Sequence, residues 1–154
     1  MTEKSAWLNL LMESKINQFN EWRMANISVK IDLSGMDFSG KNLSNAYLNA
    51  IKCIGANLSN CNLSKTNFAQ SEITDSNFEN ADLTDAILIY GNLKNSKFMN
   101  SNLTRTNFMW SDLRNCDLRG SKFNRTVFVE AKLQNAKLDP LDKESGYLKF
   151  AKLE

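Results

Sequence analysis

Few residues of this chain have the chemistry that catalysis or metal binding needs. The sequence contains no histidine, which excludes histidine metal ligands, Ser-His-Asp triads and Cys-His pairs. Its three cysteines, Cys53, Cys61 and Cys116, are odd in number and show no Cys-x-x-Cys spacing, so neither a metal site nor a disulfide framework is indicated. Asp82 and Asp85 could form a carboxylate pair, but a sequence repeat accounts for both. We therefore predict a protein that is not an enzyme and that binds no cofactor and no metal.

Composition indicates one globular domain. A length of 154 residues suits a single domain, and a hydrophobic fraction of 42% is enough for a core. The net charge of +2 predicts neither a nucleic-acid-binding surface nor an acidic surface that imitates DNA. No apolar run is long enough to span a membrane, and the first residues lack the apolar core of a secretory signal. Together with the cysteine pattern, this predicts a reducing, cytoplasmic setting.

The repeat consists of a large apolar residue at every fifth position, 22 times without a skip from Leu33 to Leu138. A mostly small residue lies two positions earlier, and Asn or Asp usually separates the two. Neither a helix, with a period of 3.6, nor a strand, with a period of 2, explains a period of five. A short strand followed by a bend does. If the large residue is called i, then i−2 and i point inward, i−1 and i+1 point outward, and the chain turns near i+2, where Gly and Asn are frequent. All three cysteines fall on inward positions and are interpreted as small core residues.

This pattern resembles the pentapeptide repeat family, with Gly40-Lys41-Asn42-Leu43-Ser44 and Ala81-Asp82-Leu83-Thr84-Asp85 as good examples. The resemblance covers about residues 31–140. It implies an all-β solenoid, a right-handed quadrilateral β-helix with four repeats per coil and hence about 5.5 coils. At ~4.8 Å per coil the rod would be roughly 26 Å long.

Residues 1–30 are predicted to form a capping helix and a lead-in to the rod. Apolar side chains recur at helical spacing across residues 3–25. We expect this helix to cover the open N-terminal end of the core, with Trp7 or Trp22 against the first coil, because an uncovered β-helix exposes apolar side chains and unpaired strand edges. The alternative is an amphipathic helix that binds a partner or a membrane.

Residues 141–154 allow two interpretations. Leu148 stays in frame with the repeat, so the segment is either a further part-coil or a short tail that packs on the end. Members of the family often form homodimers end to end through this region. The resemblance therefore implies Tyr147, Leu148 and Phe150 as dimer contacts.

One side of the predicted rod is apolar on its outer surface. Residues 20 apart would stack on one side, and the side whose inward residues run from Leu48 to Phe128 carries apolar outward residues; we call it the apolar wall. The predicted protein-binding residues on it are Tyr47, Ile87, Ile89, Tyr90, Met109, Trp110, Val127 and Val129. Apolar patches of this extent usually mark contacts, and Tyr and Trp are favoured at binding hot spots. The wall could be covered by the chain's own C-terminal tail, by a second copy, or by a different protein.

Charge is distributed unevenly along the rod. Residues 31–90 hold seven acids and three bases, whereas residues 91–138 hold nine bases and three acids. The basic half could contact phosphates. A solvated surface is the preferred interpretation, because no aromatic residues interleave with these bases as they do in single-strand binders. Direct binding of nucleic acid is not expected.

Two functions follow from these observations. The first is a rigid, non-catalytic scaffold for protein–protein interaction, with an unidentified protein partner and a possible homodimer. The alternative comes from the family, some of whose bacterial members bind and protect DNA gyrase, either with an acidic rod or with loops that project from it. This chain departs from both, because its second half is basic and residues 31–140 contain no insertion.

Overall fold

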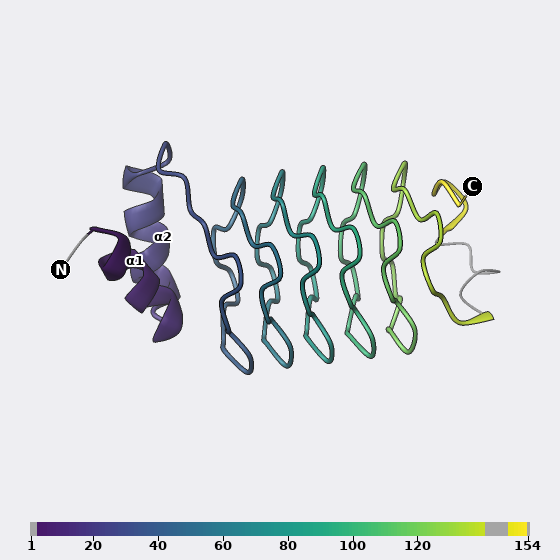
Figure 1. Cartoon of the computed structure of the whole chain (residues 1–154), viewed down its shortest axis with the longest axis horizontal. Coiled ribbons are helices and arrows are strands. Elements are labelled where there is room, and N and C mark those ends of the chain that lie inside the picture. The colour runs from purple at the N-terminus through teal and green to yellow at the C-terminus, as the bar shows by residue number, and fades with distance from the viewer. Residues whose placement is uncertain (1–2, 141–147, 154) are drawn as a thin grey trace.

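The computed structural model describes residues 3–140 and 148–153. Helices α1 (Glu3–Met12) and α2 (Ile16–Ala25) lie at one end of a row of similar coils, and the C-terminus lies at the other (Figure 1). Isolated parallel β-bridges hold the coils together, and each bridge joins residues 20 apart, from Asp32–Lys52 to Lys132–Lys152. Four five-residue repeats therefore make one coil, which is a repeat β-solenoid.

The repeats share one backbone turn. The i+2 residue has a positive φ at each repeat from Gly35 to Asn135, and in most repeats the N–H of i+3 donates to the carbonyl of i, as Lys41 does to Phe38 (3.0 Å). This is the pattern of a type II turn, which favours Gly and Asn at its third position. The turn predicted near i+2 is confirmed.

Neighbouring coils are joined through the backbone. The N–H of Leu43 donates to the carbonyl of Asn62 in the next coil (2.8 Å), and the N–H of Asn62 donates back to the carbonyl of Lys41 (3.0 Å). The same two bonds recur from coil to coil. An inner coil is therefore paired on both sides, and unpaired edges occur only where the stack ends.

The small residues and the Asn and Asp residues of the repeat form hydrogen bonds with backbone N–H and carbonyl groups that the bonds between coils do not fully use. Asn or Asp at i−1 accepts the N–H of i+1, as Asp32 does from Ser34 (2.9 Å), which forms a local Asx turn. An inward Thr or Cys donates to a carbonyl of the preceding coil, as Cys116 does to Leu93 (3.0 Å). Most buried polar groups of the described coils thus find partners inside the rod.

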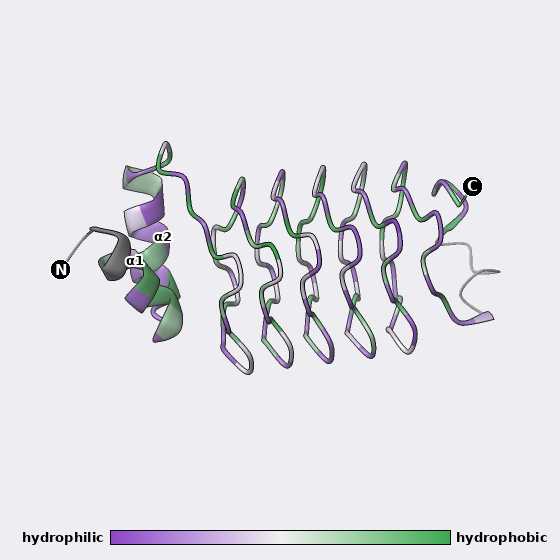
Figure 2. Cartoon of the chain, viewed as in Figure 1, coloured by the Kyte–Doolittle hydropathy of each residue, from purple (hydrophilic) through white to green (hydrophobic). Residues whose placement is uncertain are grey.

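The core is one continuous column of large side chains. Apolar and polar residues alternate along the coils (Figure 2), and the inward phenylalanines other than Phe123 are fully buried. Phe78 stacks on Phe98 with ring centroids 4.7 Å apart, and Phe108 stacks on Phe128 at 5.2 Å. Buried residues of α1 and α2, including Trp7 and Phe19, belong to the same apolar cluster as the coils.

The single helix predicted over residues 3–25 is wrong, because the chain forms two helices there. Ser14 has a φ of 55°, its N–H donates to the carbonyl of Leu11 (3.0 Å), and the N–H of Lys15 donates to the carbonyl of Leu10 (2.8 Å). These two bonds form a Schellman motif, which ends α1. Helical spacing alone does not reveal the break, because the left-handed position carries Ser instead of Gly. Neither helix has the length or apolar character to cross a membrane, within the part of the chain described.

At the C-terminal end, residues 148–153 continue the repeat. Leu148 is buried in the core cluster. The N–H of Leu133 donates to the carbonyl of Lys152 (2.7 Å), and the N–H of Lys152 donates to the carbonyl of Ala131 (2.8 Å). Of the two alternatives for this segment, the described residues form a part-coil. The predicted contact residue Tyr147 lies outside them.

Candidate protein-binding surface

The exposed large apolar side chains of the coils are concentrated on one side of the rod. Between residues 31 and 138 there are four of them, and all four lie on the apolar wall. They are Tyr47, Ile87, Tyr90 and Trp110. A random scatter of surface apolar residues would not place all four on one side, so the wall is the candidate site.

The coils bring seven of the eight predicted wall residues together. Three successive coils contribute them, and residues 20 apart lie side by side, as the bridge from Ile87 to Asn107 shows. The seven are Ile87, Ile89, Tyr90, Met109, Trp110, Val127 and Val129; Ile89, Met109, Val127 and Val129 are half-buried, and the others are exposed. Tyr47 lies two coils before Ile87, with Asn67 between them, so it stands apart from this cluster.

Tyr90 and Trp110 form the most prominent feature of the wall. Both lie at the i+2 corner, with φ angles of 56° and 58°, and their side chains are 53% and 47% exposed. A left-handed conformation costs about 1–2 kcal/mol for residues other than Gly, Asn and Asp. Backbone stability therefore does not account for a large aromatic residue at this corner, which the repeat places at the predicted turn position i+2.

Two residues of α2 complete the backbone edge at the N-terminal end of the wall. The side chain of Asn20 accepts the N–H of Tyr47 (2.9 Å) and donates to the carbonyl of Asn45 (2.9 Å). The Arg23 guanidinium donates to the carbonyls of Val29 (2.7 Å) and Asn49 (3.1 Å). These hydrogen bonds take the place of those that a preceding coil would make with the first coil.

Arg23 and the segment that follows it were missed by sequence reasoning. Arg23 is only 5% exposed, and burial lowers the pKa of its guanidinium. Its bonds place Val29 beside Asn49, and both Val29 and Ile27 are exposed. Ile27 and Val29 lie 20 residues, or one coil, before Tyr47 and Asn49. Extending the repeat backward by one coil would therefore have predicted that the wall continues to Ile27 and Val29.

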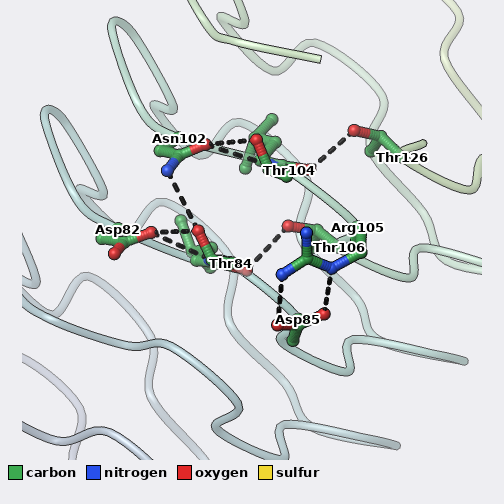
Figure 3. Close-up of polar contacts among 10 residues, drawn as sticks. Asp82, Thr84, Asp85, Asn102, Thr104, Arg105, Thr106 and Thr126 are labelled. Atoms are coloured by element: carbon green, nitrogen blue, oxygen red, sulfur yellow. Dashed lines mark hydrogen bonds and ion pairs between the residues drawn. The ribbon is translucent and has the colours of Figure 1, made fainter. Parts of the chain in front are cut away.

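One neighbouring side of the rod differs sharply from the wall (Figure 3). There the Asn102 amide donates to the Thr84 hydroxyl (3.0 Å), which itself donates to Asp82 (2.6 Å). At the corner next to the wall, Arg105 donates two hydrogen bonds to Asp85 (2.6 and 2.7 Å). The hydrogen bonds from Arg105 hold the pKa of the Asp85 carboxyl below its usual value. On this side, the polar side chains form hydrogen bonds and ion pairs with one another.

The cysteines are buried in the core, as predicted, and are free thiols. Burial raises the pKa of the Cys53 and Cys116 thiols to about 12 and that of Cys61 to about 11. A thiol of this kind is a poor nucleophile and a poor metal ligand. Residues 3–140 and 148–153 contain no group of three potential metal ligands.

These features define a repeat β-solenoid with one apolar side. The chain belongs to the pentapeptide repeat family, whose model matches residues 51–88, 76–115 and 106–139 in eight copies. Among solved structures, it is similar to a pentapeptide repeat protein from the thylakoid lumen of Arabidopsis thaliana. That protein is 26% identical with a TM-score of 0.61, over 79% of this chain and 81% of that one.

More distant structures share the fold alone. Rfr23 from the cyanobacterium Cyanothece 51142 is 24% identical, over 79% of this chain and 94% of that one, with a TM-score of 0.47. QnrB1, a plasmid-mediated fluoroquinolone resistance protein, is 17% identical over 70% of this chain and 72% of that one, with a TM-score of 0.44. No curated protein matches the chain.

Proposed function

We propose that the protein is a non-catalytic scaffold that binds another protein through the apolar wall. The observation that carries this proposal is that all four exposed large apolar side chains between residues 31 and 138 lie on that wall. Exposed apolar side chains gathered into one patch, unlike singly scattered ones, are a feature of contact surfaces. The stacked pair of Tyr90 and Trp110 is of the residue types that dominate binding hot spots.

The rod that carries the wall is proposed to be rigid. We propose about 5.5 right-handed coils, closed at the N-terminal end by α1 and α2. The bonds from Asn20 and Arg23 to the first coil support the closure. A rod in which each coil is fixed by both neighbours holds the wall residues at constant spacing, so a partner meets a preformed surface.

A photo-crosslinking residue placed at Ile87 tests the proposal in cells of the source organism. Ile87 and Lys97 both occupy exposed i−1 positions, two repeats apart and therefore on opposite sides of the rod, so Lys97 is the matched control. We expect the position 87 variant to form covalent adducts with another polypeptide and the position 97 variant to form none. Equal adducts from both positions, or none from either, would contradict the proposal.

A homodimer is a second candidate arrangement, and Phe150 supports it because this side chain is 61% exposed at the C-terminal end. Leu148 is buried within the chain and is not accessible for such a contact. Light scattering of the full chain, of Trp110→Asp and of a truncation after Leu138 distinguishes the cases. A dimer lost only on truncation places the contact at the C-terminal end, whereas a dimer lost with Trp110→Asp places it on the wall.

Gyrase protection stays an alternative proposal. Neither an acidic rod nor an insertion between residues 31 and 140 supports it. A supercoiling assay with purified gyrase and ciprofloxacin tests it directly, and the absence of protection at micromolar protein would rule it out.

A further inference from the structure

The size of the apolar wall restricts what can cover it. Five coils at ~4.8 Å give a length of about 24 Å, and about three residues between corners give a width of about 10 Å. The flat area is thus of the order of a few hundred Å², whereas a stable interface between globular proteins buries about 800 Å² on each partner. A single secondary-structure element lying along the rod matches this area better than a second rod does.

The backbone of the wall restricts the kind of element. Along the wall, backbone N–H groups pair between coils, as Leu88 does with Asn107 (2.8 Å) and Asn107 with Ala86 (3.0 Å). An extended segment laid on the wall would find no strand edge to pair with. A helix satisfies its own backbone internally, and about 16 residues of helix span 24 Å.

The polar groups within the wall are hydrogen-bond donors. Asn67 and Asn107 use their Oδ1 atoms to accept the N–H groups of Ala69 (2.9 Å) and Met109 (3.0 Å). Their side-chain NH2 groups have no partner among the described residues. These donors favour a ligand with acceptor oxygens. They disfavour a lipid surface, because hydrocarbon leaves such donors unsatisfied.

The charged residues at the margins of the wall leave an excess of bases. Asp85 is paired with Arg105, and Glu130 is paired with Lys152 (2.6 Å). In the coil that carries Val127 and Val129, Arg125 lies at the corner before Val127, and Lys132 lies on the adjoining side, just past the corner at Glu130; both are exposed. Neither forms an ion pair with a described residue. The net charge at the margins is therefore positive, and it attracts carboxylates.

We propose that the wall binds one amphipathic helix of a partner protein, about 16 residues long, with an apolar stripe and carboxylates along both borders of the stripe. This proposal rests on the wall being a protein-binding surface and adds the identity of the occupant. The apolar stripe covers Ile89 and the Tyr90–Trp110 stack, and the carboxylates meet Arg125, Lys132 and the Asn107 amide. The interaction is thus both apolar and electrostatic.

A helix-biased 16-residue peptide library, displayed on phage and selected on the immobilised full chain, tests the occupant without knowledge of the partner. We expect the selected peptides to be acidic and to carry apolar residues at i, i+3, i+4 and i+7. Their affinity should fall by about tenfold or more with Trp110→Asn, fall with Arg125→Ser and with added salt, and be unchanged with Lys97→Ser. Neutral or basic peptides, or peptides indifferent to Trp110→Asn, would overturn the proposal.

Two further results would overturn the occupant while leaving the wall as a contact surface. One is co-sedimentation with phosphatidylserine vesicles that Trp110→Asn abolishes. The other is a dimer by light scattering that the same substitution dissociates. If the wall did not bind another protein at all, the result would differ: photo-crosslinking at position 87 would give no more adducts than at position 97.

Discussion

The rings of Tyr90 and Trp110 stack at the same corner of two successive coils, with centroids 4.9 Å apart and planes 8° apart. Both residues have a left-handed backbone. An aromatic stack stabilises by about 0.5–1.5 kcal/mol, and the left-handed conformation costs about 1–2 kcal/mol for each residue. The strain of the two residues together, about 2–4 kcal/mol, exceeds what the stack contributes, whereas the strain at Trp110 alone nearly cancels the stack, so Trp110 contributes little net stability.

We therefore predict that Trp110→Asn changes the free energy of unfolding by less than about 1 kcal/mol, while it weakens binding to the wall. Asn suits this corner, as Asn95 and Asn115 show at equivalent positions. Urea denaturation followed by circular dichroism measures the stability. The reverse change, Asn60→Trp, is the control; it places a Trp at a left-handed corner without a stacking partner and should destabilise by about 1 kcal/mol. A Trp110→Asn variant destabilised by more than about 2 kcal/mol would show that the pair is structural.

We expect single substitutions in the core to have the largest effects on the free energy of unfolding. Phe98 is fully buried and stacks on Phe78, so Phe98→Ala should lower the free energy of unfolding by about 3–5 kcal/mol through lost burial and the cavity left behind. Phe123 occupies the same position of its repeat but is only half-buried. Phe123→Ala is thus the matched control and should cost clearly less in the same urea titration. Equal losses would mean that inward packing is not the determinant of stability.

A structural feature of this protein could be predicted from the sequence where it recurs along the chain, and could not where it occurs once. The five-residue period predicted the inward positions, the turn at i+2 and the burial of Cys53, Cys61 and Cys116. Each of these features recurs along the chain, so one atypical repeat does not obscure it. The wall residues followed from the 20-residue coil that the family implies. The break at Ser14 did not, because it depends on one local turn without glycine.

Features that depend on a single long-range contact were also invisible. Asn20 and Arg23 are ordinary polar residues of a helix until the first coil lies beside them, and only the structure brings them to the edge of the coil. The left-handed backbone at Tyr90 and Trp110, by contrast, follows from their i+2 positions in the repeat, and it is their aromatic side chains that depart from the Gly and Asn preferred at such turns. Such departures from the repeat pattern are where a function is most readily sought.

The bonds from α2 to the first coil give a residue-specific prediction. Because the N–H of Tyr47 donates to Asn20 Oδ1, Asn20→Ala removes the only acceptor that the described residues offer to this N–H. We expect hydrogen exchange of the Tyr47 amide, measured by NMR, to accelerate strongly, while the amide of Asn67, which donates to Ala46 in the preceding coil, keeps its protection. Loss of protection at both amides would mean that the whole first coil unfolds.

The thiols give a prediction about chemical reactivity. Burial raises the pKa of Cys61 to about 11 and those of Cys53 and Cys116 to about 12. At pH 8 the folded protein should therefore contain almost no thiolate, and the thiol reagent DTNB should label no cysteine. In 8 M urea the same reagent should label three. One thiol that reacts rapidly in the folded state would contradict the inward placement of that cysteine.

Three carboxyls that pair with arginines, Asp85, Asp112 and Asp117, are expected to make stability fall in acid. Hydrogen bonds from Arg105 and Arg119 lower the pKa of Asp85 and Asp117, and for Asp112 the bonds from Arg114 outweigh the burial that acts against them. A carboxyl whose pKa is lower in the folded state stabilises that state above its usual pKa of 3.8. This stability is lost as the pH falls through the folded-state pKa. The urea midpoint should therefore drop between about pH 5 and pH 2.

Replacing Asp85, Asp112 and Asp117 together by Asn should flatten this decline. The amide oxygen of Asn can still accept the turn N–H groups that Asp112 and Asp117 accept, as Asn107 does at the same position of its repeat, so the substitution removes the charge and keeps the turn. The midpoint of the triple variant should lie below that of the parent at pH 7 and approach it at pH 2. Asp75→Asn serves as the control, because Asp75 accepts a hydrogen bond from Asn95 and has no ion pair among the described residues. If the decline were as steep in the triple variant as in the parent, these pairs would not cause the acid sensitivity.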